Sequence, residues 1–189
     1  SDGPVASVAL FSARPLVEIR SIAVDTSSRT STGLLRVLCR ESFDIEPEFV
    51  PMPPAIDAML ERCDAALVIG DPALYLGPGA VGVEKIDLGE VWGGLTGLPF
   101  VWAFWAGRPG VPPAVALDAL RDARDAGVAS SDAIADAYCG SERAALGRAY
   151  LRENIRYGFD ERAAAGLRKY YELAEKHGVI DAVRPTVFY

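Results

Sequence analysis

The sequence predicts an α/β fold, because short apolar strands alternate with segments of helical periodicity. Strands are predicted at residues 22–25, 48–50 and 65–69, and apolar residues at helical spacing separate them near residues 34–39 and 56–62. This alternation favours a layered sheet with largely parallel strands. Because ligands of such sheets usually bind beyond the carboxyl ends of the strands, we expect functional residues at that edge.

Two further apolar runs and a helical second half complete the prediction. Residues 5–11 and 100–106 are predicted strands that flank an α/β region over about residues 20–97. The prolines that follow residue 50 are expected to end the strand at 48–50. Helices are predicted near residues 114–126, 132–138, 142–155 and 160–177, with start signals at Ser131 and Asp160 and a stop signal at Gly178.

The composition is typical of a globular protein and excludes several classes of function. The chain has 189 residues, 50% hydrophobic and 24% charged, enough to bury one core or two small lobes. Its net charge of -7 argues against nucleic acid or an anionic membrane as a partner, because both select a basic face. The apolar runs are too short to span a bilayer, and no signal peptide is visible. Three widely spaced cysteines form neither a disulfide framework nor a zinc-ligand pattern, so we expect a reducing cytoplasm.

A hydroxyl-rich turn between the strand at residues 22–25 and the next helix is the most informative candidate site. It contains Thr26, Ser27, Ser28, Arg29, Thr30 and Ser31. The first turn of a helix has backbone N–H groups without intrahelical partners and the positive end of the helix dipole, so an anion is stabilised there. The simpler alternative is that Ser27 or Ser28 is only an N-cap. One cap needs one hydroxyl, so five hydroxyls and an arginine favour a cradle for a carboxylate or phosphate.

A second polar site is predicted at the same edge of the sheet. The strand at residues 65–69 ends in Gly70-Asp71-Pro72, which places Asp71 beyond the carboxyl end of that strand. The alternative for Asp71 is an N-cap role, because aspartate is a preferred cap and Pro72 suits the first helical position.

Other conspicuous residues are expected to be structural. His177 is the single histidine and ends a predicted helix, where a cation or polar cap is favourable, so a Ser/His/Asp triad is not expected. The aromatic residues at 102, 104 and 105 are more typical of a core strand than of a stacking site. Five arginines alternate with acidic residues on predicted solvated helix faces: Arg121, Arg124, Arg143, Arg148 and Arg152.

Four motifs occur in the order seen in one known family. They are GPVxSV at residues 3–8, DTSSRTS at 25–31, DAALVIGD at 64–71 and DLGxxWxxLTGLPFVxA at 87–103. In these motifs the chain resembles the chorismate dehydratases of the futalosine route to menaquinone, the MqnA family. The resemblance extends over nearly the whole chain and is tightest from Gly3 to Gly107.

The resemblance implies a fold and a reaction. The fold would be the two-lobed type 2 fold of periplasmic solute-binding proteins. Residues 1–19 would form a junction strand and connection, residues 20–97 an α/β lobe, and residues 98–189 a return strand and helical segment that complete the other lobe. The reaction would eliminate water from chorismate, a small dicarboxylate, to give 3-[(1-carboxyvinyl)oxy]benzoate without a metal or redox cofactor.

The resemblance also implies site residues. Ser7 and Asp71 would face the ring of the substrate as catalytic residues. The alternative for Ser7 is an ordinary polar residue on a half-buried strand. The substrate carboxylate would be bound by Thr26, Ser27, Ser28, Arg29, Thr30, Ser31 and Gly70.

One departure from the family concerns the start of the chain. Members of the family begin with a further segment, containing a Phe-Leu-Asn-like motif, to which nothing in this sequence corresponds. We therefore expect the amino-terminal part of the first lobe to be missing from this chain, and expect the chain alone to be a poor catalyst. Exposed sheet edge and apolar surface would then favour a homo-oligomer.

Two other functions are open at this point. A non-catalytic solute-binding or effector-sensing domain for a small carboxylate shares the same fold, and fold alone does not determine function. The related pathway enzyme that makes 1,4-dihydroxy-6-naphthoate also shares it. That enzyme has a histidine-containing motif where this sequence has the hydroxyl-rich turn and Gly70-Asp71.

Overall fold

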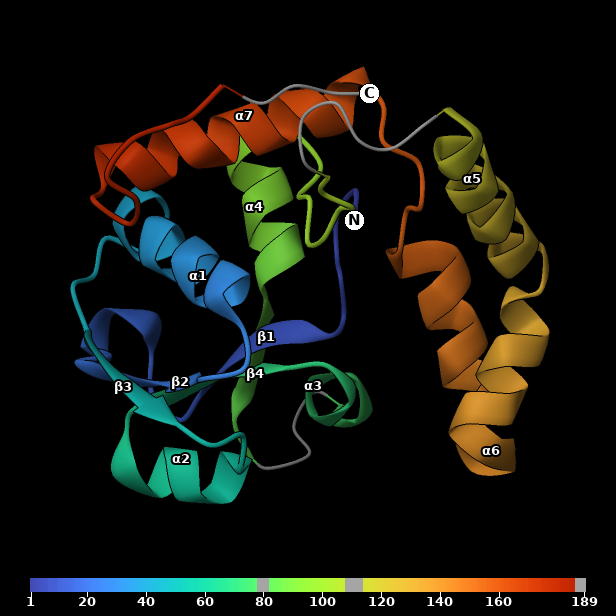
Figure 1. Cartoon of the computed structure of the whole chain (residues 1–189). Coiled ribbons are helices and arrows are strands. Elements are labelled where there is room, and N and C mark those ends of the chain that lie inside the picture. The colour runs from blue at the N-terminus through green and yellow to red at the C-terminus, as the bar shows by residue number, and fades with distance from the viewer. Residues whose placement is uncertain (78–81, 108–113, 186–189) are drawn as a thin grey trace. The chain divides into compact units, whose positions relative to one another are not determined.

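The structure is a computed structural model that describes residues 1–77, 82–107 and 114–185. These residues form two compact units. One consists of Ser1–Trp102 with Asp160–Tyr189, and the other of Ala103–Phe159. The first unit contains a sheet with helices on it, and the second is helical (Figure 1).

A five-stranded sheet forms the centre of the first unit. Its strands, in the spatial order β3-β2-β4-β1-β5, are β1 (Val8–Ser12), β2 (Ser21–Asp25), β3 (Glu48–Met52), β4 (Ala65–Ile69) and β5 (Glu84–Asp87). β2 is parallel to β3 and β4, whereas β1 is antiparallel to β4 and β5. Two of the four pairings are thus parallel and two antiparallel, so the predicted α/β class is confirmed, but the sheet is mixed rather than largely parallel in its pairing.

Helices cover both faces of this sheet, as Figure 1 shows. α2 (Ile56–Arg62) and α3 (Asp71–Tyr75) pack on one face, and α1 (Arg29–Glu41) and α4 (Leu88–Thr96) lie over the other. α7 (Glu161–Lys176) packs on α1, and the 3-10 turn η1 (Leu16–Glu18) connects β1 to β2. The Asp160 carboxylate caps α7 by accepting from the Ala163 N–H at 2.8 Å, and Gly178 follows the helix with φ of 65°, both as predicted.

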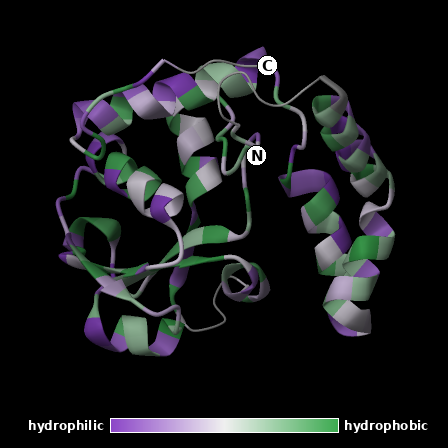
Figure 2. Ribbon diagram, in the orientation of Figure 1, coloured by the Kyte–Doolittle hydropathy of each residue, from purple (hydrophilic) through white to green (hydrophobic). Residues whose placement is uncertain are grey.

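Alternate residues of each strand supply the two halves of the core, because successive side chains point to opposite faces. On the α2 and α3 side, a buried cluster contains Ala9, Phe11, Ala23, Met59, Cys63, Ala66, Val68 and Ala73. On the other side, the predicted apolar face of α1 is buried, with Leu34, Leu35 and Leu38 at 0% exposed and Cys39 at 1%. Figure 2 shows hydrophobic residues along the strands, and alternating hydrophilic and hydrophobic segments on the helices.

The second unit consists of α5 (Ala114–Ala129), α6 (Ser131–Ala149) and the π-helical turn η2 (Tyr150–Asn154). The helices predicted near residues 132–138 and 142–155 are one element with a kink at Gly140, where φ is 67° and ψ is 174°. The predicted solvated faces carry ion pairs that join Arg121 to Asp118, Arg124 to Asp125, Arg148 to Asp136 and Arg152 to Asp132. In the described part of the chain, every helix is too short or too polar to cross a membrane.

Both edge strands differ from the prediction. β3 continues through Pro51, which lies opposite Val24, because an edge strand tolerates a proline that donates no hydrogen bond. β5 was not predicted at all, since its sequence Glu-Lys-Ile-Asp contains three charged residues and shows no apolar run. The antiparallel pairing with β1 holds these residues in the extended conformation that their own sequence does not indicate.

The predicted strand at residues 100–106 is also wrong. This segment has no regular structure, and within the described part of the chain its backbone pairing is limited to Phe100, which exchanges two hydrogen bonds of 3.0 Å with Ser1. The Phe100 ring packs edge-on against Trp92 and Tyr170 at centroid distances of 5.3 and 5.1 Å. Phe104 and Trp105 are 49% and 68% exposed, so the core role expected for them is wrong as well.

Candidate functional site

The predicted site residues meet at one edge of the sheet. The carboxyl ends of β2 and β4 lie there together with the start of the antiparallel strand β1. The hydroxyl-rich turn follows β2, Gly70 and Asp71 follow β4, and Ser7 directly precedes β1. Two of these groups are joined directly, because the Gly70 N–H donates to the Ser7 carbonyl at 2.7 Å.

Ser28 is the N-cap of α1, the position that the simpler alternative gives it. Its Oγ accepts a hydrogen bond from the backbone N–H of Ser31 at 3.1 Å and donates one to the Ser31 Oγ at 2.9 Å. Ser31 is only 3% exposed. The hydroxyls of Ser28 and Ser31 therefore organise the first turn of the helix, with Ser28 half-buried and Ser31 buried.

The remaining residues of the turn are accessible. Thr26, Ser27 and Arg29 are exposed, and Thr30 is half-buried. The buried Asp25 carboxylate holds the turn closed by accepting from the Ser27 N–H at 2.8 Å. Because the first N–H groups of a helix have no intrahelical acceptor, the start of α1 combines backbone donors with the hydroxyls around them, an arrangement suited to an anion.

Gly70 and Asp71 begin α3, but Gly70 takes the N-cap position that was considered for Asp71. Gly70 is the N-cap, with φ of 68°, a conformation that glycine adopts without strain. Asp71 is the first helical residue, so an N-cap role for Asp71 is wrong. No side-chain hydrogen bond caps α3 among the described residues. Asp71 is half-buried, whereas Ser7 is 6% exposed.

Sequence reasoning missed Asp87, at the end of β5, which organises the same edge. Its Oδ1 accepts the N–H groups of Gly89 at 2.8 Å and Glu90 at 3.0 Å and so caps α4. The same carboxylate accepts the N–H groups of Val5 and Ala6, directly before Ser7. The spacing Asp87-x-x-Glu90 is a helix-start signal that could have located the cap, but nothing local indicates the contacts with residues 5 and 6.

Lys85, two residues earlier on β5, was missed as well. Its ammonium donates to the carbonyls of Ala73 at 2.5 Å and Leu76 at 3.0 Å, at the end of α3. Burial lowers the pKa of Lys85, and the nearby Asp87 carboxylate opposes this shift. The end of the helix that begins at Asp71 is thus held by a partly buried cation.

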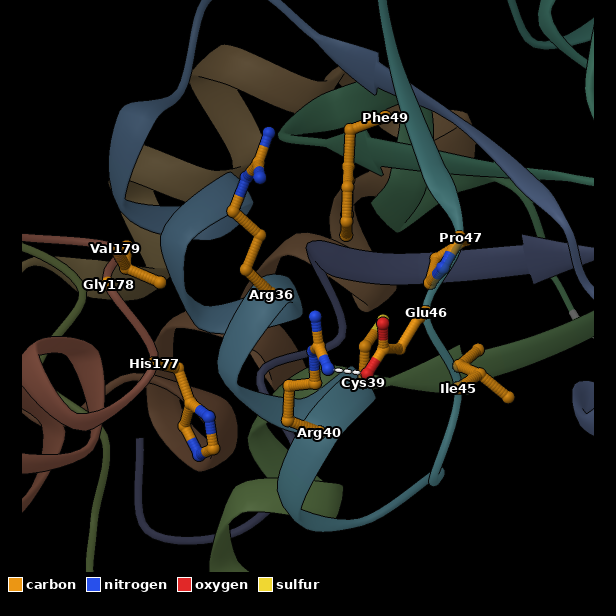
Figure 3. A pocket seen from close by; sticks show the side chains of 10 residues that line it. All are labelled: Arg36, Cys39, Arg40, Ile45, Glu46, Pro47, Phe49, His177, Gly178 and Val179. Atoms are coloured by element: carbon orange, nitrogen blue, oxygen red, sulfur yellow. Dashed lines mark ion pairs between the residues drawn. The ribbon is translucent and has the colours of Figure 1, made fainter.

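A hollow of about 240 Å³ lies away from these residues, between the last turns of α1, the start of β3 and the end of α7 (Figure 3). Arg36 stacks over the Phe49 ring at 4.2 Å, and Arg40 forms an ion pair with Glu46. The cations of this hollow are thus engaged by protein groups, and it contains none of the predicted site residues.

His177 has the structural role predicted for it. Its Nε2 lies 2.5 Å from Glu41 Oε1, to which Lys176 also donates at 2.5 Å. The hydrogen bond from Lys176, followed by that from His177, lowers the pKa of Glu41. Burial raises the pKa of the Cys39 thiol to about 12. Within residues 1–77, 82–107 and 114–185, no cluster of three or more His, Cys, Asp or Glu side chains could hold a metal ion.

Comparison with known proteins agrees with the motifs. A family model described as menaquinone biosynthesis matches residues 1–176, which include every residue of the candidate site. The chorismate dehydratase of Thermus thermophilus is 32% identical over 189 aligned residues, covering 90% of this chain and 68% of the relative. A match over this length at this identity means that the chain belongs to the menaquinone biosynthesis family, the MqnA family that its motifs predicted.

Proposed function

We propose that the protein is a chorismate dehydratase, a carbon–oxygen hydro-lyase that converts chorismate to 3-[(1-carboxyvinyl)oxy]benzoate in menaquinone biosynthesis. The name of the Thermus relative and the family match support this activity. The structural observation that supports it best is the meeting of Ser7, the hydroxyl-rich turn and Gly70-Asp71 at one edge of the sheet.

The reaction explains which groups the site needs. Elimination breaks the bond from a ring carbon to its hydroxyl and a neighbouring ring C–H bond. The hydroxyl and the proton leave as water, and the C–H electron pair completes an aromatic ring. Much of the driving force therefore belongs to the substrate. The enzyme has to hold a dianion in a reactive geometry, exclude water and move one proton.

Each group of the sheet edge fits one of these tasks. The accessible N–H and hydroxyl groups at the start of α1, with Arg29, would bind a substrate carboxylate. Ser7 and Asp71 would face the ring, where the Asp71 carboxylate would accept the proton or orient the departing hydroxyl. The Gly70 N–H is used by the Ser7 carbonyl, so Gly70 would contribute by bringing the backbone close to the substrate.

We further propose the two-lobed fold of periplasmic solute-binding proteins for the whole protein. The mixed sheet with helices on both faces is compatible with one lobe of such a fold. In this proposal residues 20–97 form the α/β lobe together with β1 and α7, which belong to the same compact unit, and the second unit forms part of the other lobe.

The decisive experiment is incubation of the full chain with chorismate, with the loss of one water measured by mass spectrometry and chromatography. We expect slow formation of the enolpyruvyl ether of 3-hydroxybenzoate, because the chain alone is expected to be a poor catalyst, and loss of this turnover in Ser7→Ala. Ser12→Ala is the matched control, because Ser12 is a buried serine at the opposite end of β1 whose Oγ bonds to the backbone of Arg14. Binding that returns chorismate unchanged would instead identify a non-catalytic carboxylate receptor.

A further inference from the structure

The carboxylate of Asp87 joins the start of α4 to the segment before Ser7. Its Oδ2 accepts the Ala6 N–H at 2.6 Å, and both oxygens lie within hydrogen-bond distance of the Val5 N–H, at 3.0 and 3.1 Å. Together with the N–H groups of Gly89 and Glu90, four backbone donors converge on this one side chain. Helix capping alone would require only the last two.

The segment held in this way has an unusual conformation. Ala6 has φ of 63°, in the left-handed region that residues other than glycine rarely adopt. Val5 is 1% exposed and Ser7 6% exposed on either side of it. Strained backbone of this kind persists only where surrounding contacts impose it, and the short bond from Ala6 to Asp87 is such a contact.

The approach of α4 to this segment is close enough to require glycine at position 89. A Cβ built on Gly89 would lie 2.7 Å from the Gly3 carbonyl oxygen and 3.1 Å from the Val5 nitrogen. Both of these atoms belong to the backbone, so they cannot move aside as a flexible side chain would. Asp87 and Gly89 therefore determine together where residues 3–6 lie.

The position of this segment also determines the position of the candidate catalytic residues. Ser7 follows Ala6 directly, and the Ser7 carbonyl accepts the Gly70 N–H at 2.7 Å, one residue before Asp71. Val8 then enters the sheet opposite Ile69. A displacement of Ala6 would thus move Ser7 and would strain the contact that joins Ser7 to the start of α3.

We infer that Asp87 is a positioning residue for the dehydration reaction: its carboxylate holds Ala6 in the left-handed conformation and thereby fixes Ser7 against Gly70 and Asp71. This inference rests on the proposed function, because Ser7 and Asp71 are catalytic only if the protein acts on chorismate. It adds to that function a residue that touches neither the substrate nor the reacting atoms.

Asp87→Asn tests the inference. Asparagine caps helices as well as aspartate does, so the amide oxygen still accepts from residues 89 and 90, while the amide group replaces the acceptor of the Ala6 N–H. We expect kcat to fall by about 10- to 100-fold with little change in KM, as for a small misplacement of a reacting group. Asp160→Asn is the matched control, because Asp160 caps α7 in the same way but, among the described residues, bonds to no segment of the site. It should leave kcat unchanged.

A rescue variant separates positioning from a general loss of stability. Glycine adopts a positive φ without strain, so Ala6→Gly in the Asp87→Asn background should restore part of the lost kcat. A defect in the capping of α4 would not respond in this way, because residue 6 does not belong to that helix. Equal loss of kcat in Asp87→Asn and Asp160→Asn, in proportion to their loss of thermal stability, would overturn the inference, as would an absence of rescue.

Amide hydrogen exchange keeps the inference testable apart from the activity. In Asp87→Asn the amide of Ala6, which donates to the lost Oδ2, should exchange faster than in the wild type, whereas those of Gly89 and Glu90, which donate to the retained oxygen, should not. If the wild-type chain does not convert chorismate, the proposed function fails, and exchange still decides whether Asp87 fixes this segment. Unchanged exchange at Ala6 would show that it does not.

Discussion

The two edges of the sheet, at the amino and carboxyl ends of β2 and β4, each contain an aspartate that accepts several hydrogen bonds. The two aspartates hold different segments of the chain in place. At the edge where β2 and β4 begin, Asp64 accepts from the backbone N–H groups of Arg20 at 2.9 Å and Ser21 at 3.0 Å and pairs with Arg14 at 2.9 Å. The hydrogen bond from Arg20 is the main reason that the pKa of Asp64 is lowered. At the opposite edge, Asp87 accepts from the start of α4 and from Val5 and Ala6.

The two carboxylates make the same kind of hydrogen bond, but the segments that they hold have different roles. Asp64 ties together segments that connect strands and bear no candidate site residue, so its loss should reduce stability alone. Asp87 ties together segments that end at Ser7, so its loss should reduce turnover. The same interaction, a carboxylate that satisfies backbone donors, serves packing at one edge and positioning at the other in our proposal.

The largest expected effect at the site edge is that of Asp71→Asn. If the Asp71 carboxylate accepts the ring proton or orients the leaving hydroxyl, its loss should lower kcat by about 10²- to 10⁴-fold. Because Gly70 and not Asp71 is the N-cap of α3, the fold should be unaffected. Asp57→Asn, a change at an exposed aspartate in the first turn of α2, is the control for lost charge. Wild-type turnover in Asp71→Asn would move the proton transfer to Ser7 or to a carboxylate of the substrate.

Reversing the charge at Arg29 should affect binding rather than turnover. Arg29→Glu places a negative charge beside the predicted carboxylate site, and hydrogen bonds to charged groups contribute about 1.5–3 kcal/mol. We expect calorimetry with a benzoate analogue, which is not turned over, to show a Kd that is higher by about tenfold or more. Arg168→Glu changes an exposed arginine of α7 in the same way and should leave the Kd unchanged. Equal affinities in both variants would contradict a carboxylate site at the start of α1.

At the other edge, Asp64→Asn should reduce stability without reducing kcat. Asn retains one acceptor oxygen but loses the charge that strengthens the bonds from Arg20, Ser21 and Arg14. Loss of charge-assisted hydrogen bonds of this kind should cost about 1–2 kcal/mol. We expect a Tm lower by several degrees in thermal unfolding, by about 2–4 °C per kcal/mol, with kcat and KM at wild-type values. A change in kcat at constant stability would break the distinction between the two edges.

The sequence predicted those elements whose signals lie within a few residues of one another. The helix from Ile56 to Arg62 and the strand from Ala65 to Ile69 have the predicted bounds, because both have clear periodicity and clear stop signals. The hydroxyl-rich turn was recognised for the same reason, since capping is a local interaction within four residues.

The parts that escaped prediction depend on contacts between distant residues. The order β3-β2-β4-β1-β5 and the reversed direction of β1 have no local signal. Asp87 contacts Ala6 across 81 positions of the chain, so its role could not be found by reading its neighbours. The segment at residues 100–106 has the composition of a strand, but only Phe100 finds a backbone partner, Ser1, in the described structure. An apolar composition shows that a segment can form a strand, but not that a neighbouring strand is there to pair with it.

The smallest expected effect concerns Glu41, at the end of α1 away from the hydroxyl-rich turn. Glu41→Gln removes the charge that pairs with Lys176 and His177, an interaction near the surface that should contribute about 0.5 kcal/mol. Because folding lowers the pKa of Glu41 from its ordinary value of 4.5, the contribution is fully present above that pH and is lost as the pH falls through the lower folded pKa.

Denaturant unfolding at a series of pH values checks both the size and the sign of this effect. The stability difference between wild type and Glu41→Gln should shrink as the pH falls below about 4.5, because the wild-type carboxyl is then protonated as well. Glu61→Gln, a change at an exposed glutamate of α2, should show no such pH dependence. The affinity for chorismate should not change, since the pair lies at the far end of the helix from its first turn. A raised Kd in Glu41→Gln would mean that the last residue of α1 influences the anion site at its start, and that the two edges of the sheet are coupled through this helix.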